Sequence, residues 1–334
     1  MIHRKLFSQV KNMSKNFNAQ ASSSGLGSRS WGVVAALLLV YVVWGTTYFA
    51  IGIAVQTMPP LLMNALRFLG AGSVMLALAL WQGHALPTAV QWRNAAVIGG
   101  CMVFLAMNLT AFAQKLGIGS GLMATVVTTM PMWLALWSRW GGERVPLTSW
   151  IGLALGAAGA LLLALEGDFS ATWLGGLLAF AAPLCWSVGS YASRKLAQPA
   201  PAMASAAQWF AGGAMGLVVA PWFEPLSALG QVSAVSWAAW VYLLVFGTLV
   251  ALNAYLWLLK NTSSALAGSY SFVNPAVALL VGVVLGGERL TGWVFAALPL
   301  IGAALVLILY GKALSERWAR RGVALPPGPA GQVG

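Results

Sequence analysis

The sequence predicts an all-α integral membrane protein with ten transmembrane helices in two inverted five-helix repeats. Two observations support this fold class. Of the 334 residues, 60% are hydrophobic and only 7% are charged, and the apolar residues form long runs, as in transmembrane helices. The tetrapeptide Gly-Gly-Glu-Arg occurs at 141–144 and again 145 residues later, at 286–289. The chain therefore contains two related halves.

Ten apolar runs are long enough to cross a bilayer, which takes about 20 residues of helix. Short loops rich in glycine, proline and charge separate them. The predicted spans are 31–53, 60–81, 94–114, 119–138, 147–165, 173–194, 202–222, 237–258, 263–285 and 291–311.

The duplication sets the predicted domain organisation. Residues 31–165 form the first repeat and 173–312 the second, with five spans in each. Because five is odd, the second repeat enters the membrane from the opposite side, so a pseudo-two-fold axis in the membrane plane relates the halves. The polar tails, 1–30 and 313–334, are predicted to be disordered.

The distribution of basic residues predicts the orientation. The formal net charge is +12, which alone is compatible with nucleic-acid binding. With a cytoplasmic N-terminus, however, 15 of the 18 Lys and Arg residues fall on cytoplasmic loops and tails. This is the positive-inside pattern, with both termini cytoplasmic. We therefore expect a lipid bilayer and a small-molecule substrate as partners, and no nucleic acid.

Several short motifs have a family likeness. They are Trp44-Gly-Thr-Thr-Tyr-Phe, Pro59-Pro60, Arg67-Phe68, Ser269-Tyr-Ser-Phe-Val-Asn-Pro275 and Gly286-Gly-Glu-Arg. Together they resemble the drug/metabolite transporter superfamily, in particular EamA-type exporters of the YedA-like inner-membrane branch. The resemblance implies a bacterial inner-membrane protein whose central cavity is lined by helices 1–4 and 6–9. It also implies efflux of amino acids, related metabolites or amphiphilic compounds.

Arg67 is the one basic residue in the interior of a predicted span, since Arg194 stands at the very end of its own. An arginine at that depth is costly unless it is paired or reaches water. One interpretation is an anchor for a carboxylate or other acidic group of the substrate. The alternative is a guanidinium that snorkels to the interface or binds carbonyls of a kinked helix.

Asn108 and Asn253 occupy equivalent depths, 145 residues apart, and Tyr255 follows the second. Amides and hydroxyls in the membrane need partners and should face the bundle interior. They either line a cavity and bind substrate, or hold neighbouring helices together. Both interpretations stay open from the sequence.

Pro131 and Pro275 lie near the middle of the fourth and ninth spans. A proline inside a helix removes one backbone hydrogen bond and kinks the helix, and freed backbone is tolerated where it lines a wet cavity. Tyr270 and Asn274 stand near the second proline and suit such a cavity. The prolines are candidate kink or gating positions, or they serve packing alone.

Trp44, Thr47 and Tyr48 in the first span combine aromatic faces with hydroxyls. This combination suits amphiphilic or amino-acid-like solutes and equally suits a gate. The fifth and tenth spans are almost wholly apolar, with glycines four residues apart at Gly152 and Gly156. Such faces permit close helix packing, so we expect a scaffold within a monomer or, alternatively, a homodimer interface.

The sequence favours a secondary transporter over other classes. It has no Walker phosphate-binding loop, and its acids and histidines lie outside the predicted spans. We therefore expect no cofactor and no metal, and no cluster suited to an integral membrane enzyme. A channel-like pore is the other alternative, although rings of charge are missing. Without a titratable group at membrane depth, a facilitator or exchanger is as compatible as proton antiport.

Overall fold

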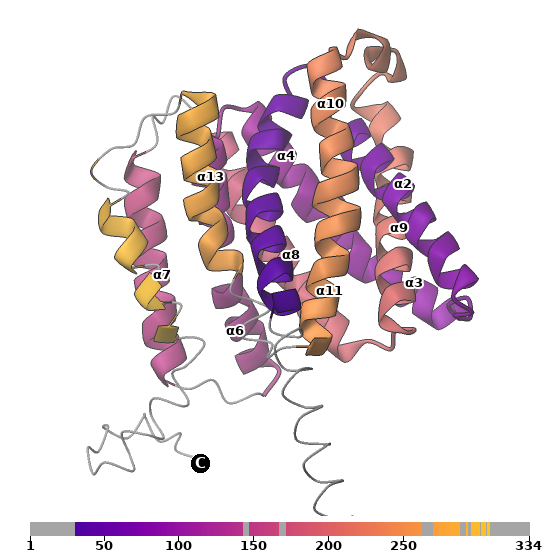
Figure 1. Ribbon diagram of the computed structural model, residues 1–334, viewed down its shortest axis with the longest axis horizontal. Helices are drawn as coiled ribbons and strands as arrows, with labels where there is room; N and C mark the ends of the chain where they lie inside the picture. Colours follow the sequence, from indigo (N-terminus) through magenta and orange to yellow (C-terminus); the bar gives the residue numbers. More distant parts are fainter. Residues whose placement is uncertain are drawn as a thin grey trace, which may run out of the picture.

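The computed structural model describes residues 31–142, 147–166, 172–261, 270–287, 292, 295–300, 302–304 and 306–307, and within them all regular structure is helical (Figure 1). Among the described residues, seven helices are long and apolar enough to cross a membrane. They are Trp31–Ala54, Pro60–Trp81, Ala89–Lys115, Ser120–Trp140, Trp173–Lys195, Pro201–Trp222 and Ala234–Tyr255.

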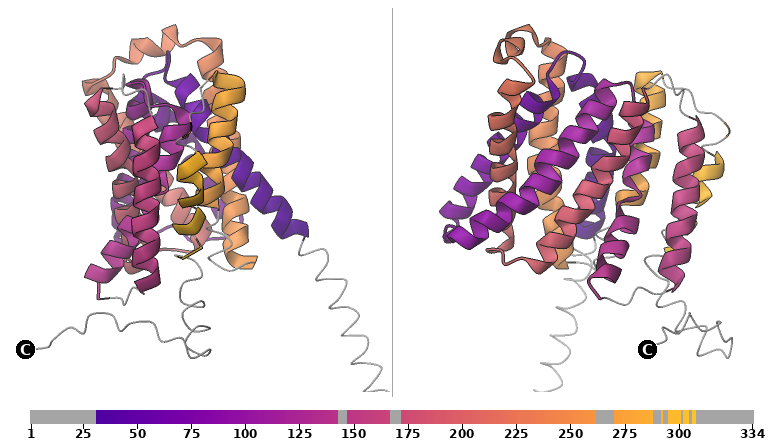
Figure 2. Two further views of the ribbon diagram at one scale, coloured as in Figure 1. Left: turned by 90° about the vertical axis from the view of Figure 1, so that its left-hand side faces the viewer. Right: turned by 180° about the vertical axis from the view of Figure 1, so that it is seen from behind.

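The spans of the first half divide into shorter elements. The first span, Trp31–Ala54, begins at an angle to the bundle (Figure 2, dark indigo). The elements that follow are α2 (Pro60–Trp81), α3 (Ala89–Gly99), the π-helix η1 (Gly100–Ala106), α4 (Met107–Lys115), α5 (Ser120–Val127), α6 (Met130–Trp140) and α7 (Leu147–Glu166).

The second half follows the same order. Its elements are α8 (Trp173–Lys195), α9 (Pro201–Val219), the 3-10 helices η2 (Ala220–Trp222) and η3 (Leu226–Gln231), α10 (Ala234–Tyr242), the π-helix η4 (Leu243–Val250), α11 (Ala251–Asn261) and α13 (Tyr270–Gly286). A further apolar helical stretch covers Phe295–Ala304.

These elements confirm the all-helical fold and supply seven membrane-span candidates among the described residues, whereas the count of ten stays a prediction. α7 has 20 residues and α13 has 17, both at predicted positions. The tetrapeptide repeats lie partly outside the described residues, as do the tails 1–30 and 313–334 and parts of the ninth and tenth spans.

The third span of each half has the same construction. Thr88 caps α3 with a capping box, and Ser233, 145 residues later, caps α10. These caps start the two helices earlier than the hydropathy predicts. Each span then passes through a π-helix, η1 in the first half and η4 in the second. Gly142 and Gly287, also 145 residues apart, both have positive φ.

Hydrogen bonds between the halves define two ends of the bundle. The segment that follows α9 lies at the upper end of Figure 1, and in it Glu224 accepts bonds from the amides of Leu61 and Leu62 at the start of α2. At the lower end, Asn94 near the start of α3 donates to the carbonyl of Ala197, just before α9. α2 and α3 therefore run opposite to α9 and α10, their counterparts in the second half.

α2 and α9 form the most extensive helix pair in the bundle. A Cβ added at Gly72 would lie 2.4 Å from the backbone nitrogen of Phe210, and one at Gly213 would lie 2.4 Å from that of Leu69. Only glycine fits such close backbone contact. This antiparallel pair joins the two halves at the centre of the fold.

The fourth span is interrupted immediately before its proline. α5 ends at Val127, and α6 starts at Met130 with Pro131 in its first turn. A proline lacks the backbone N–H and clashes with the carbonyl four residues earlier, which here belongs to Val127. Pro275, in contrast, lies inside the continuous helix α13.

α7 stands at the edge of the bundle beside the short C-terminal stretch (Figure 2, right). A Cβ added at Gly156 would lie 3.3 Å from the Cβ of Ala304. The small-residue face of α7 thus packs within the chain at this point, as expected for a scaffold.

Candidate functional site

The site begins with Arg67, which α2 places against the π-helix η4. The side chain is 4% exposed, and its Nε donates a 2.8 Å hydrogen bond to Oγ1 of Thr248. Thr248 in turn donates to the carbonyl of Leu243, five residues earlier. In a π-helix the backbone bonds pair residues five apart, so the threonine hydroxyl reinforces one π turn.

The Nη end of the Arg67 guanidinium has hydrogen-bond donors without partners in the part of the chain that the structure describes. Among the described residues, Nη1 of Arg67 has no hydrogen-bond partner. Gly247 lies close to both Arg67 and Thr47. A Cβ added at Gly247 would be 3.4 Å from Nη2 of Arg67 and 3.5 Å from Oγ1 of Thr47. The guanidinium also stands 4.7 Å from the ring centre of Phe68. A buried guanidinium with unused donors is a strong site for a carboxylate or another oxygen acceptor.

A cluster of three aromatic rings is linked to this cation through Gly247. Trp44 in the first span donates from Nε1 to the carbonyl of Gly247 at 2.9 Å. Its ring is 5.3 Å from that of Tyr255 on α11 and 4.6 Å from that of Tyr270 on α13, and the two tyrosine rings are 5.5 Å apart. Gly247 therefore contacts both the cation and the aromatic cluster, which together form the Arg67–Trp44 cluster.

Two further predicted residues lie one helical turn from this cluster. Tyr48 follows Trp44 by four residues and packs against Ala113 and neighbouring apolar residues of α5 and α8. Asn274 follows Tyr270 by four residues on α13, is 6% exposed, and its Oδ1 has no partner among the described residues. An unpaired buried amide oxygen costs free energy until a donor reaches it.

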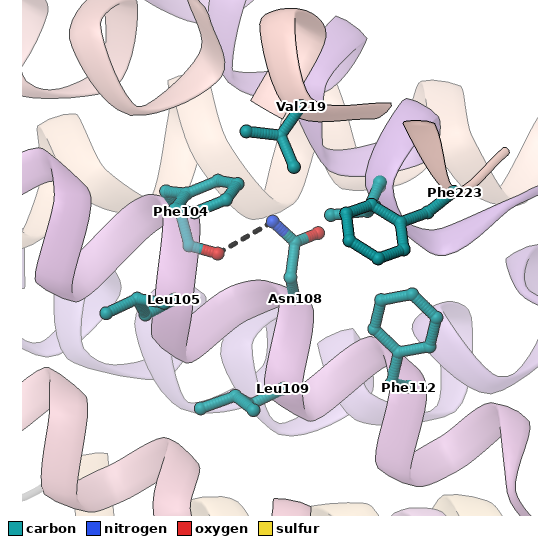
Figure 3. A pocket seen from close by; sticks show the side chains of 8 residues that line it. Phe104, Leu105, Asn108, Leu109, Phe112, Val219 and Phe223 are labelled. Carbon is teal, nitrogen blue, oxygen red and sulfur yellow. Dashed lines mark hydrogen bonds between the residues drawn. The ribbon is translucent and has the colours of Figure 1, made fainter. Parts of the chain in front are cut away.

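Asn108 lies elsewhere. It accepts a 3.0 Å hydrogen bond from Asn64 on α2 and donates to the carbonyl of Phe104. Figure 3 shows its amide within a pocket of about 340 Å³ whose other lining side chains are apolar, among them Phe112 and Phe223. Here the asparagine joins α4 to α2, as the helix-contact interpretation predicts.

Asn253 also lies apart from the cluster. Its side chain is exposed, donates to the carbonyl of Leu249 at 2.5 Å, and reaches the sulfur of Met75 at 3.6 Å. The structure therefore does not bring Asn108 and Asn253 together with Arg67. The repeat gives them the same bond to the carbonyl four residues earlier, while their other printed partners are Asn64 and Met75 and not Arg67.

Sequence reasoning missed several buried polar residues. Thr248 binds Arg67, Asn64 binds Asn108, and Glu224 is 8% exposed while it caps α2. The sequence did contain a signal for these residues. A polar residue within a span and an acid in a short loop each need a hydrogen-bond partner. Among the described residues, no group of three His, Cys, Asp or Glu side chains is placed to hold a metal.

Within the described residues, a helical bundle with seven membrane-span candidates and a buried cation linked to an aromatic cluster is typical of multi-pass membrane transport proteins. Comparison with known proteins gives the family. The model of the EamA-like transporter family matches the chain twice, over residues 30–165 and 173–310, and the chain belongs to this family.

Relatives in the family are named as transporters. The inner membrane transporter YedA of Escherichia coli (strain K12), itself uncharacterized, is 38% identical over 84% of this chain and 91% of its own. A "Probable amino-acid metabolite efflux pump" of Salmonella typhimurium is 28% identical over 85% of this chain and 96% of that protein. These names indicate an inner-membrane transporter rather than an enzyme.

The fold is also that of a solved structure. One crystal structure superposes with a TM-score of 0.63 at 24% identity, covering 85% of this chain and 98% of that one. At this identity the likeness concerns the fold alone.

Proposed function

We propose that the chain is a secondary transporter that exports amino acids, related metabolites or amphiphilic compounds across the inner membrane. The observation that carries this proposal is the buried guanidinium of Arg67, whose Nη1 has no partner among the described residues and which Gly247 links to the ring cluster of Trp44, Tyr255 and Tyr270. The printed name of the Salmonella relative, an amino-acid metabolite efflux pump, agrees with this substrate class.

The proposed binding mode follows from the chemistry of these groups. A substrate carboxylate accepts hydrogen bonds from Arg67, whose guanidinium offers donors only. The apolar part of the substrate packs on the three rings, and Thr47, Tyr48 and Asn274 contribute hydroxyl and amide contacts close by. In this structure Asn108 and Asn253 lie outside the Arg67–Trp44 cluster. In this proposal they contact the substrate only in another conformation of the transporter.

Alternating access is supported by the opposed directions of equivalent helices. Ten helices in two inverted repeats give inward-open and outward-open forms related by symmetry. The interruption before Pro131 and the proline within α13, Pro275, are the proposed bending points. In this scheme the lower end, where Arg93, Arg139 and Arg194 lie, faces the cytoplasm together with both termini.

We propose transport down the substrate's own gradient. Within the described spans, no carboxylate or imidazole lies at membrane depth, and Glu224 is held at the upper end by α2. The described spans thus present no carboxylate or imidazole for proton binding and release.

Counterflow in liposomes tests the proposal. Purified protein should show saturable uptake of labelled amino-acid carboxylates that is accelerated by unlabelled substrate inside, without a pH difference. Arg67→Gln should weaken the apparent affinity for carboxylates by about tenfold or more, since charged hydrogen bonds are worth about 1.5–3 kcal/mol. Amine substrates without a carboxylate should be spared. Flux that neither saturates nor shows counterflow would indicate a pore and refute the carrier.

A further inference from the structure

A second cavity lies toward the upper end of the bundle, beyond the Arg67–Trp44 cluster along the first span. Its volume is about 500 Å³. Its walls come from both halves: Gln56 follows the first span, Gly119 precedes α5, Val235 is near the start of α10, and Leu285 is near the end of α13. Cavities that bind small molecules commonly measure about 300–1,000 Å³.

Gln114 gives this cavity a chemical preference, and the polar residues Gln56 and Ser120 line it as well. It lines the cavity and is only 7% exposed. Its Nε2 donates to the carbonyl of Tyr48 at 2.9 Å, while its Oε1 has no hydrogen-bond partner among the described residues. With the amide nitrogen occupied, the group presents an acceptor. An unpaired, buried acceptor of this kind is stabilised by a ligand that brings an N–H or O–H donor.

We propose that this cavity is a second binding site, which takes the amino group of a small amphiphile through Gln114. The site complements the one at Arg67, where only donors are offered and a carboxylate is preferred. At the Gln114 oxygen itself a carboxylate is disfavoured, because two acceptors would face each other. Phe49, Ile53 and Ile118 line the same cavity and contact the apolar part of the ligand.

Gly52 offers an independent way to close the cavity. It lines the space, and a Cβ added to it would meet no other atom within 4 Å. A larger side chain therefore occupies the cavity without displacing backbone, and a helix tolerates most residues better than glycine. Gly52→Phe removes the space, whereas Gln114→Leu removes the acceptor.

Calorimetry on the full chain in lipid nanodiscs tests the proposal with two probes, 2-phenylethylamine and 3-phenylpropionate. The amine should bind the wild type without being displaced by the carboxylate. Gln114→Leu should weaken the amine by about tenfold, and Gly52→Phe should abolish its binding. The matched controls are Gln208→Leu, at a glutamine bound to Gln198, and Gly176→Phe, at another open helix glycine. Both should bind the amine as the wild type does.

The outcomes separate this site from the proposed transport function. Arg67→Gln should weaken 3-phenylpropionate and leave the amine unchanged. A wild type that does not bind the amine overturns the second site, as does unchanged amine binding in monodisperse Gln114→Leu and Gly52→Phe. Competition between the two probes for one site overturns it too. Amine binding without carboxylate binding leaves the second site standing and counts against the role of Arg67.

Discussion

Glu224 provides the sharpest test of how the two halves are held together. Its carboxylate is 8% exposed and accepts hydrogen bonds of 3.0 and 2.9 Å from the amides of Leu61 and Leu62. Because α2 begins with Pro60, these are the first two N–H groups that the helix has to offer. A carboxylate there also interacts favourably with the helix dipole.

The magnitude follows from what each substitution leaves behind. Glu224→Ala leaves two buried donors without partners, at about 1–3 kcal/mol each, so a loss of about 3 kcal/mol is expected. Glu224→Gln keeps one oxygen acceptor and the shape of the side chain but loses the charge. It should lower the free energy of unfolding by about 1 kcal/mol. For a chain of 334 residues, 3 kcal/mol corresponds to a fall in Tm of about 4 °C.

Thermal unfolding in one detergent, followed by circular dichroism, measures these shifts. Ser227→Ala, at an exposed position of the same loop, is the matched control and should unfold with the wild type. The wild type should have the highest Tm, Glu224→Gln a lower one and Glu224→Ala the lowest. If Glu224→Ala unfolds at the wild-type temperature, the carboxylate does not cap α2 and the reasoning fails.

Three further predictions concern the site, the helix contact and the orientation. Thr248→Val removes the acceptor of Arg67 Nε and should raise the KM for carboxylates in counterflow by about tenfold, with Thr248→Ser restoring it. Wild-type KM in Thr248→Val would contradict this. Gly213→Leu should prevent a monodisperse peak in size-exclusion chromatography, because a Cβ there would lie 2.4 Å from the nitrogen of Leu69; Gly176→Leu should leave the peak intact. A membrane-impermeant maleimide should label Gly230→Cys in intact cells and miss Ala85→Cys, since these loops lie at opposite ends; the reverse result would invert the proposed topology.

The positions of the spans were predictable because hydropathy reports directly on burial in lipid. The predicted second span, 60–81, coincides with α2, and the predicted first span, 31–53, is within one residue of the observed helix. The third span starts five residues before its prediction, at Ala89, because the capping box at Thr88 outweighs the polarity of the first turn. Local capping chemistry sets that boundary, and hydropathy does not report on it.

The direction in which polar side chains point was not predictable in the same way. Asn108 and Asn253 both follow a π-helix, η1 and η4 respectively. A π turn takes up an extra residue, which rotates every later side chain by about 100° relative to an unbroken α-helix. The sequence carries no clear mark of this rotation. The depth of the two asparagines could therefore be predicted from the repeat, but the helix face on which each lies could not. Tyr255 also follows η4 yet joins the cluster, while Asn253, two residues earlier, lies about 200° away around the same helix. Trp44 and Arg67 lie in helices where the structure describes no π-helix, and it brings them to one place through Gly247.

The two π-helices also bear on the history of the chain. A π turn within an α-helix is the structural form of one inserted residue. η1 and η4 overlap when the halves are aligned by the 145-residue offset, and each lies in the third span of its half. The simplest history has one insertion in a five-helix ancestor, followed by duplication and fusion. Relatives that lack the extra residue in one half alone would then have lost it after the two copies began to diverge.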